Sequence, residues 1–223
     1  MRLALACDYD GTLATDGVVD ESTIAALQRF SNAGKKLIFV TGRQLDDLLN
    51  VFPQVVLFDW VVAENGALLY HPQTRVSTAL ADPPPQRFVQ QLQERGVDPV
   101  SKGQVIVATW HPHETTVLEV IQELGLAYQV ILNKGAVMIL PDGMNKATGL
   151  QKALEHLEIA PENTVSVGDA ENDRAMLSLC GYGVAVNNAL PELKAMADWV
   201  TTGDRGSGVV ELIDRLLEKD SPA

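Results

Sequence analysis

Short apolar segments of strand length alternate with amphipathic segments through most of the chain. Residues 3–7, 36–40 and 164–167 are such apolar runs, and each is followed by a polar turn and by apolar residues at helical spacing. Buried parallel strands need helical crossovers between them, so this alternation is typical of a parallel sheet covered by helices. The sequence therefore predicts an α/β fold with a Rossmann-like parallel sheet.

One segment interrupts the alternation. Asp82-Pro83-Pro84-Pro85 is a candidate linker, because consecutive prolines end regular structure. Beyond it the pattern predicts a helix, a strand, a second helix and two more strands, and a helix at residues 146–157 then resumes the alternation. A self-contained block of this kind indicates an insertion. We expect a core of residues 1–82 and 141–223, with a small α/β unit of residues 83–140 inserted into it.

The balance of charge limits the partners. The chain has 17 Lys and Arg against 29 Asp and Glu, a formal charge of −12. An acidic chain repels nucleic acid and anionic lipid surfaces, so we expect neither as a partner. It also repels a phosphorylated substrate, unless a local cation reverses the field at the binding site.

Several features favour a cytoplasmic protein. Cys7 and Cys180 both lie in apolar runs, which predicts buried free thiols rather than a disulfide. The apolar run before Asp8 is too short for a signal sequence. No other stretch approaches the roughly 20 apolar residues that cross a bilayer.

Two carboxylates follow the first apolar run, in Asp8-Tyr9-Asp10-Gly11-Thr12. Side chains two residues apart at the end of a strand can face the same pocket. There, one carboxylate could attack phosphorus and the other could transfer a proton. Taken alone, the segment could equally be an exposed acidic turn that ends a strand.

Two further segments place phosphate-binding groups at the start of a helix. Thr41-Gly42-Arg43 offers a hydroxyl, backbone amides and a guanidinium, although an ordinary helix cap would explain it too. Lys146 stands in the first turn of a predicted helix, where the helix dipole disfavours a cation. A role in neutralising a nucleophile and a phosphate would account for that position. Surface lysines are common, however, so an ordinary exposed lysine is the alternative.

The segment Gly168-Asp169-Ala170-Glu171-Asn172-Asp173 gathers three carboxylates and an amide at the end of another apolar run. Oxygen ligands of this kind suit Mg²⁺. A negatively charged helix N-terminus would explain Glu171 and Asp173, but it explains Gly168-Asp169 less well. Because open α/β sheets form their sites at the carboxyl ends of the strands, we expect these segments to share one site.

In this order the four segments resemble the motifs of the haloacid dehalogenase-like hydrolase superfamily of aspartate-nucleophile phosphatases. Those motifs are D-x-D-G-T, an apolar run ending in T-G-R, a lysine, and G-D-x-x-N-D, and the resemblance covers roughly residues 1–217. The inserted block is similar to the small cap of the Cof-type or sucrose-phosphatase-like (type IIB) branch. The resemblance implies a Mg²⁺-dependent phosphoric monoester hydrolase. Its substrate would be a small phosphorylated metabolite such as a sugar phosphate, phosphoglycolate or a glycosyl phosphoglycerate.

The resemblance also implies roles for individual residues. Asp8 would be the nucleophile, Asp10 the general acid and base, and Lys146 the neutralising cation. The residues implied in substrate binding are Thr41, Gly42, Arg43 and Asn172. Those implied in metal binding are Asp8, Asp10 (through its backbone carbonyl), Asp169 and Asp173. Asn65 and residues 204–208 would border the site.

A phosphomannomutase-like phosphotransferase would share these motifs and is the alternative. A mutase must hold a second phosphate against its cap, yet residues 83–140 supply only the cations Arg87, Arg95, Lys102 and Lys134. If the chain were a non-catalytic binding module, we would expect some catalytic residues of the motifs to be replaced, but all four segments are intact. We expect the polar cap residues to face solvent, namely His111, His113, Asn133 and Lys134, and we expect Trp110 to lie in the core. The oligomeric state is open.

Overall fold

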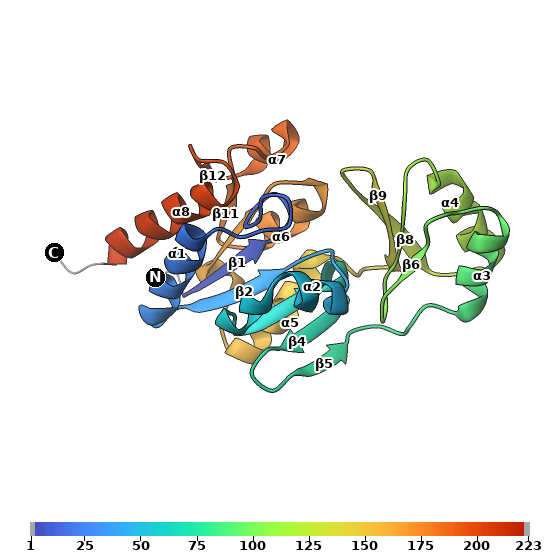
Figure 1. The fold of residues 1–223 in the computed structure, drawn as a ribbon, viewed down its shortest axis with the longest axis horizontal. Helices are drawn as coiled ribbons and strands as arrows, with labels where there is room; N and C mark the ends of the chain where they lie inside the picture. The colour runs from blue at the N-terminus through green and yellow to red at the C-terminus, as the bar shows by residue number, and fades with distance from the viewer. Residues whose placement is uncertain (1–2, 221–223) are drawn as a thin grey trace.

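The computed structural model describes residues 3–220, so residues 1–2 and 221–223 of the predicted core lie outside the described residues. The chain forms two lobes, seen side by side in Figure 1. One holds a sheet of eight strands and the other a sheet of four. The prediction of an α/β fold with a mainly parallel sheet and a smaller α/β unit is confirmed.

The large sheet has the strand order β12-β11-β10-β1-β2-β3-β4-β5. The strands from β12 to β3 run parallel, and β4 and β5 add an antiparallel edge. The strands are β1 (Ala4–Asp8), β2 (Lys36–Val40), β3 (Trp60–Ala63), β4 (Leu68–His71), β5 (Val76–Ala79), β10 (Thr164–Gly168), β11 (Tyr182–Ala185) and β12 (Trp199–Val200). All five residues of β1 are buried, as expected of a strand with helices on both sides.

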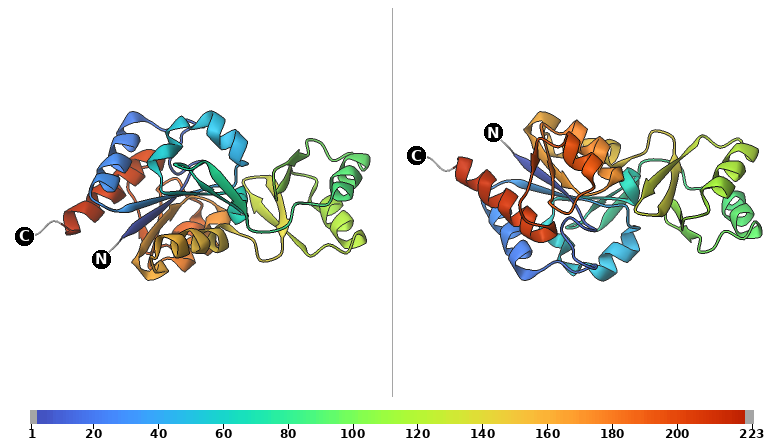
Figure 2. Two further views of the ribbon diagram at one scale, coloured as in Figure 1. Left: turned by 90° about the horizontal axis from the view of Figure 1, so that it is seen from below. Right: turned by 90° about the horizontal axis from the view of Figure 1, so that it is seen from above.

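Helices cover both faces of this sheet, as Figure 2 shows from two sides. The helices α1 and α8 pack together on one face, whereas α5 and α6 pack together on the other. The helices of this lobe are α1 (Glu21–Asn32), α2 (Leu45–Val51), α5 (Lys146–Leu157), α6 (Arg174–Leu179), α7 (Pro191–Met196) and α8 (Arg205–Asp220).

Helix capping fixes where α5 begins. The side chain of Asn145 accepts hydrogen bonds from the backbone N–H groups of Ala147 (2.9 Å) and Thr148 (3.2 Å). The hydroxyl of Thr148 in turn lies 3.0 Å from the backbone nitrogen of Asn145, which completes a capping box. Lys146 is therefore the first residue of the helix, as the sequence predicts.

The small lobe is built around an antiparallel sheet with the order β6-β7-β9-β8. Its elements are α3 (Gln86–Glu94), β6 (Ser101–Lys102), β7 (Val107–Trp110), α4 (Glu114–Glu123), β8 (Tyr128–Asn133) and β9 (Ala136–Pro141). The two helices pack on the outer face of the sheet around a core that includes Phe88, Val117 and Ile139. The two-residue strand β6 was not predicted, because it is too short to leave a periodic pattern.

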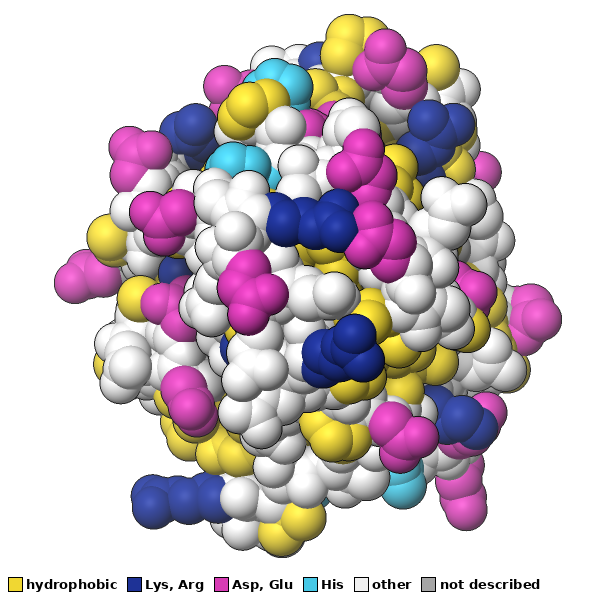
Figure 3. Space-filling view, turned by 90° about the vertical axis from the view of Figure 1, so that its right-hand side faces the viewer, with side chains coloured by type: hydrophobic (Ala, Val, Ile, Leu, Met, Phe, Trp, Pro, Cys, Tyr) yellow, Lys and Arg dark blue, Asp and Glu magenta, His cyan; other side chains and the backbone are white. Residues whose placement is uncertain are grey.

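The outer face of the small lobe carries charges of both signs. Figure 3 views the molecule from this side, and acidic, basic and apolar side chains are interspersed over it. Arg95 pairs here with Glu119, at 3.5 Å, and with Glu123. Exposed pairs of this kind add little stability.

A buried carboxylate joins the two lobes. Glu64, in the turn Glu64–Gly66 after β3, is 1% exposed. Its two oxygens accept hydrogen bonds from the backbone N–H groups of Gln104 (2.8 Å), Val105 (2.7 Å) and Ile106 (2.9 Å) in the small lobe. An apolar cluster beside it contains Ala67, Val105, Ile106, Met138 and Leu140. These contacts hold the small lobe over the carboxyl ends of the parallel strands.

Two further predictions can be checked here. Cys7 and Cys180 are buried free thiols, as predicted. Trp110 is 55% exposed, so the prediction that it lies in the core is wrong. Trp110 pairs with Ala136 on the face of the sheet that carries Met138, which is the face opposite the two helices, so the helices do not cover its ring. Among the described residues, no helix is both long and apolar enough to cross a membrane.

Candidate active site

Several of the predicted site residues meet where the strand order of the large sheet changes direction. The strands β1 and β10 are neighbours, and the chain proceeds from them toward opposite edges of the sheet. Asp8 is the last residue of β1, and Asp169 follows the last residue of β10. Open α/β sheets usually bind their ligands at such a switch point.

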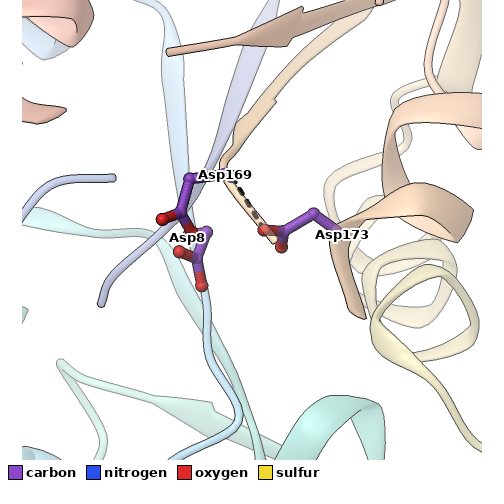
Figure 4. Close-up of side chains that lie close together, drawn as sticks. All are labelled: Asp8, Asp169 and Asp173. Carbon is purple, nitrogen blue, oxygen red and sulfur yellow. Dashed lines mark hydrogen bonds between the residues drawn. The ribbon is translucent and has the colours of Figure 1, made fainter. Parts of the chain in front are cut away.

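Three carboxylates converge at this point, as Figure 4 shows. Asp8, Asp169 and Asp173 each offer an oxygen that lies within 4.8 Å of the others, and their residues are 5%, 1% and 0% exposed. Three buried carboxylates repel one another unless cations compensate. The arrangement therefore calls for positive charge at this point.

Lys146 supplies part of that charge. Its ammonium lies 2.5 Å from an oxygen of Asp8 and 2.7 Å from an oxygen of Asp173. Burial alone would lower the pKa of Lys146, but the charges of Asp173 and Asp8 outweigh burial and raise it, so the ammonium is retained. Burial and the charge of Asp173 raise the pKa of Asp8 to about 7, although Lys146 acts in the opposite direction.

Asp173 organises the turn after β10. One of its oxygens accepts hydrogen bonds from the backbone N–H groups of Asp169 (2.9 Å) and Ala170 (3.0 Å), and the other accepts from Lys146. Asp169 differs, because its Oδ1 is buried without a hydrogen-bond partner among the described residues. Burial also raises the pKa of Asp169. An oxygen that lacks a donor suits a cation.

A second polar group faces the T-G-R segment. Asn172 donates a hydrogen bond to Oδ1 of Asn65 at 3.0 Å. This leaves Oδ1 of Asn172 and Nδ2 of Asn65 buried without partners in the described part of the chain. Thr41 is fully buried, and its hydroxyl oxygen accepts from the backbone N–H of Arg43. One acceptor and one donor thus remain available to a ligand.

Arg43 is bound to acidic side chains. Its guanidinium donates to both oxygens of Asp10 at 2.8 Å and to Asp47 at 2.6 Å. The hydrogen bonds to Asp10 raise the pKa of Arg43 above its usual range. The sequence had suggested a contact between Arg43 and substrate, and this pairing with Asp10 was not anticipated. The side chain of Asp10 is 44% exposed and stands apart from the buried cluster.

The small lobe contributes one cation to the site. Lys134, in the turn between β8 and β9, donates a hydrogen bond to Oδ2 of Asp169. Lys134 is exposed, as predicted, with 47% of its side chain accessible, but its ammonium is also paired with a residue of the core, which the sequence did not indicate. For His111 the same prediction is confirmed, since its side chain is 71% exposed beside Glu114.

The loop between β11 and α7 closes the other side. Asn188 donates to the backbone oxygen of Gly11 at 2.8 Å and accepts from the backbone N–H of Arg205 at 2.7 Å. Asn188 thereby links the D-x-D-G-T turn to residues 204–208, which the sequence analysis placed at the border of the site. Nothing in the sequence around Asn188 had pointed to it.

The chain is similar to known proteins over most of its length. The model of the haloacid dehalogenase-like hydrolases matches residues 5–101 and 129–213. A phosphoglycolate phosphatase of Methanothermobacter thermautotrophicus is 32% identical over 224 residues, which cover 96% of this chain and 98% of that protein. A phosphoglycolate phosphatase of Metallosphaera sedula is 31% identical over 227 residues, covering 96% and 98%.

Solved structures share the fold. A protein of Thermoplasma acidophilum superimposes with a TM-score of 0.80 at 16% identity, over 97% of this chain and 99% of that one. A sugar phosphatase of haloacid dehalogenase subclass IIB superimposes with a TM-score of 0.77 at 22% identity, over 96% and 98%. At these identities the likeness concerns the fold alone.

Proposed function

The chain belongs to the haloacid dehalogenase-like hydrolases and is a phosphatase of that family, and we propose that it hydrolyses a small phosphorylated metabolite through an aspartyl-phosphate on Asp8, with Mg²⁺ as cofactor. One observation carries the proposal. Asp8 is buried beside the ammonium of Lys146 and within reach of Asp169, at the carboxyl end of a central strand. Burying a carboxylate among other carboxylates costs folding free energy, which a purely structural role would not repay. A nucleophile, by contrast, needs to lie beside a cation at the point where phosphate binds.

The carboxylate cluster fits a hard divalent cation. Asp8 and Asp169 present oxygens close together, and Oδ1 of Asp169 has no donor among the described residues. Both oxygens of Asp173 already accept hydrogen bonds, so Asp173 would support the metal by holding the turn in place. The backbone carbonyl of Asp10 is the remaining candidate. Mg²⁺ bound here would offset the negative charge of the nucleophile and the phosphate.

Hydrolysis would then proceed in two transfers at phosphorus. In the first, an oxygen of Asp8 bonds to phosphorus, the bond to the leaving oxygen breaks, and Asp10 gives that oxygen a proton. In the second, water attacks the aspartyl-phosphate, Asp10 takes up the proton, and inorganic phosphate leaves Asp8. Lys146 stays beside Asp8 and offsets negative charge in both transfers.

The surrounding residues would orient the reactants. Thr41 and the backbone of Gly42 would receive phosphoryl oxygens, and Asn172 would contact the substrate with the oxygen that Asn65 leaves free. Arg43 holds both oxygens of Asp10, so at least one of these hydrogen bonds must open before Asp10 donates a proton. Arg43 would thus position Asp10 and could release it when substrate arrives.

The positions of the cap cations favour hydrolysis over a mutase reaction. A mutase needs a cationic site in the cap for a second phosphate. Arg95 is paired with glutamates on the outer layer of the small lobe, and Lys102 lies exposed on β6. Lys134 reaches the active site, but one ammonium is a sparse site for a phosphate dianion.

The test is release of inorganic phosphate from a panel of substrates with Mg²⁺ and with EDTA. The panel contains 2-phosphoglycolate, hexose phosphates, a disaccharide phosphate, a glycosyl phosphoglycerate and a nucleotide. We expect release that requires both Mg²⁺ and Asp8, so that Asp8→Asn is inactive. Consumption of a sugar bisphosphate without free phosphate would instead indicate the mutase, and full activity of Asp8→Asn would exclude Asp8 as the nucleophile.

A further inference from the structure

The small lobe turns a nearly uncharged face toward the active site. Directly paired residues of neighbouring antiparallel strands lie on the same face of a sheet. Met138 identifies the face that meets the large lobe, because it belongs to the apolar cluster between the lobes. By strand pairing, three rows lie on this face: Gln129 and Leu140, then Ser101, Ala108, Met138 and Ile131, and then Trp110, Ala136 and Asn133.

This face forms a roof close to the T-G-R segment. A side chain added at Gly42 would place its Cβ 2.6 Å from the terminal methyl of Met138, so the roof leaves no room above that glycine. Most of these side chains are apolar. The hydroxyl of Ser101 already accepts a hydrogen bond from Gln44, and the amide of Gln129 donates to the backbone of Met144, so the roof offers little hydrogen bonding to the hydroxyl groups of a sugar. Oδ1 of Asn133 is a buried acceptor without a partner among the described residues. A polyol would therefore leave most of its hydroxyls unpaired under this roof.

One cation stands at the edge of the roof. The ammonium of Lys134 contacts Asp169 and would lie 2.8 Å from a Cβ placed at Gly11. Lys134 therefore bonds directly to Asp169, and an oxygen of Asp169 lies within 4.8 Å of an oxygen of Asp8, the proposed nucleophile. A group held by Lys134 must be close to the phosphate, so only a short carbon chain can join the two.

The other cations of the site are already engaged. Lys146 is shared by Asp8 and Asp173, and Arg43 binds both Asp10 and Asp47. Lys134 has a single partner in the described part of the chain, and 47% of its side chain is exposed. A divalent cation on Asp169 would take over that partner, and Lys134 would then be the available donor for a second anion.

We propose that Lys134 selects substrates that carry a carboxylate one short carbon chain away from the phosphate, and that sugar phosphates are poor substrates. This inference rests on the proposed phosphatase activity. Lys134 pairs with Asp169 in the metal-free protein and turns to the substrate carboxylate in the complex. A charge-assisted hydrogen bond of this kind stabilises the bound state and the transition state alike, so its loss raises KM more than it lowers kcat.

The experiment compares two substrates of equal chain length in the full-length protein with Mg²⁺. One is 2-phosphoglycolate, and the other is 2-hydroxyethyl phosphate, which replaces the carboxylate by an alcohol. The variants are Lys134→Met, which keeps length without charge, Lys134→Arg, which keeps the charge, and Lys102→Met as a matched control elsewhere on the small lobe. Glucose 6-phosphate and p-nitrophenyl phosphate complete the set.

We expect wild type to prefer 2-phosphoglycolate by about 10- to 100-fold in kcat/KM, as one charge-assisted hydrogen bond allows. Lys134→Met should remove this preference through KM and leave 2-hydroxyethyl phosphate within about threefold. Lys134→Arg should keep part of the preference, and Lys102→Met should keep all of it.

Four results would overturn the inference. Equal losses on both substrates in Lys134→Met would mean that Lys134 acts on the metal site or on lobe closure. A wild-type preference for glucose 6-phosphate would mean that the roof binds the hydroxyl groups of sugars. Activity on p-nitrophenyl phosphate without any preference for the carboxylate would leave the phosphatase proposal intact and remove only the role of Lys134. A protein inactive on every substrate would remove both.

Discussion

Replacing Asp8 with asparagine should make the metal-free protein more stable at neutral pH, although it removes the proposed nucleophile. Asp8 is buried with Asp169 and Asp173, and Lys146 is the cation hydrogen-bonded to it. Burial and the charge of Asp173 raise the pKa of Asp8 from an ordinary 3.8 to about 7. Because an asparagine amide resembles a protonated carboxyl, the variant avoids the cost of ionising this group inside the protein.

The size of the effect follows from that rise in pKa. At 1.36 kcal/mol for each pH unit, the rise from 3.8 to about 7 corresponds to about 4 kcal/mol of unfolding free energy. As the pH rises, Asp8 loses its proton at a lower pH in the unfolded chain than in the folded protein. The stability contributed by the protonated form is therefore complete below pH 3.8 and is lost as the pH rises through about 7. In a chain of this length 4 kcal/mol corresponds to a change in Tm of about 10 °C.

The assay is thermal unfolding in EDTA, followed by circular dichroism between pH 4 and pH 8. The Tm of Asp8→Asn should exceed that of wild type by about 10 °C at pH 7.5, and this difference in Tm should shrink toward pH 4. Asp142→Asn, which removes an exposed carboxylate, should change Tm by little at any pH. Adding Mg²⁺ should stabilise wild type more than Asp8→Asn. An equal or lower Tm for Asp8→Asn at pH 7.5, or an increment independent of pH, would refute this account of the cluster.

Other variants test the remaining contacts. Lys146→Met should leave Asp8 and Asp173 without their shared cation. Chemical denaturation should show a loss of about 3–5 kcal/mol of unfolding free energy, and activity should be abolished. Lys152→Met, on the same helix, is the control and should lose under about 1 kcal/mol. Glu64→Gln should turn an amide N–H toward a backbone donor of the small lobe. It should cost about 1–3 kcal/mol and speed proteolytic cleavage at residues 103–106, and unchanged cleavage would contradict the role of Glu64 as a link between lobes. Asp10→Asn should lower kcat by about 100- to 10,000-fold without a loss of Tm, and wild-type turnover would exclude proton transfer by Asp10.

The fold could be predicted because its cause is local. Apolar runs such as residues 3–7 and 164–167 become buried strands wherever helical segments separate them, and the pattern repeats along the chain. The position of the main site follows from the same rule, because Asp8 and Asp169 each come at the end of such a run. Neighbouring parallel strands bring these ends together without any further information.

Contacts between the lobes could not be predicted in this way. Glu64 accepts hydrogen bonds from residues 40 to 42 positions later, and Lys134 reaches a carboxylate 35 positions away. Such pairs depend on how two separately folded sheets are docked, which leaves no periodic signal in the sequence. The pairing of Arg43 with Asp10 was missed for a related reason, because Arg43 had been assigned to the substrate and Asp10 to proton transfer and the metal.

The central claim is that Asp8 carries the phosphoryl group, and trapping that group tests it most directly. Asp10→Asn would be mixed with a turnover substrate and Mg²⁺, quenched in acid, reduced with borohydride and digested for peptide mass spectrometry. The account predicts a phosphoryl adduct before reduction, and homoserine in place of Asp8 after it, in the peptide that contains residues 3–13. Phosphate release with Asp8 unmodified at every time point, or an adduct on another residue, would contradict it.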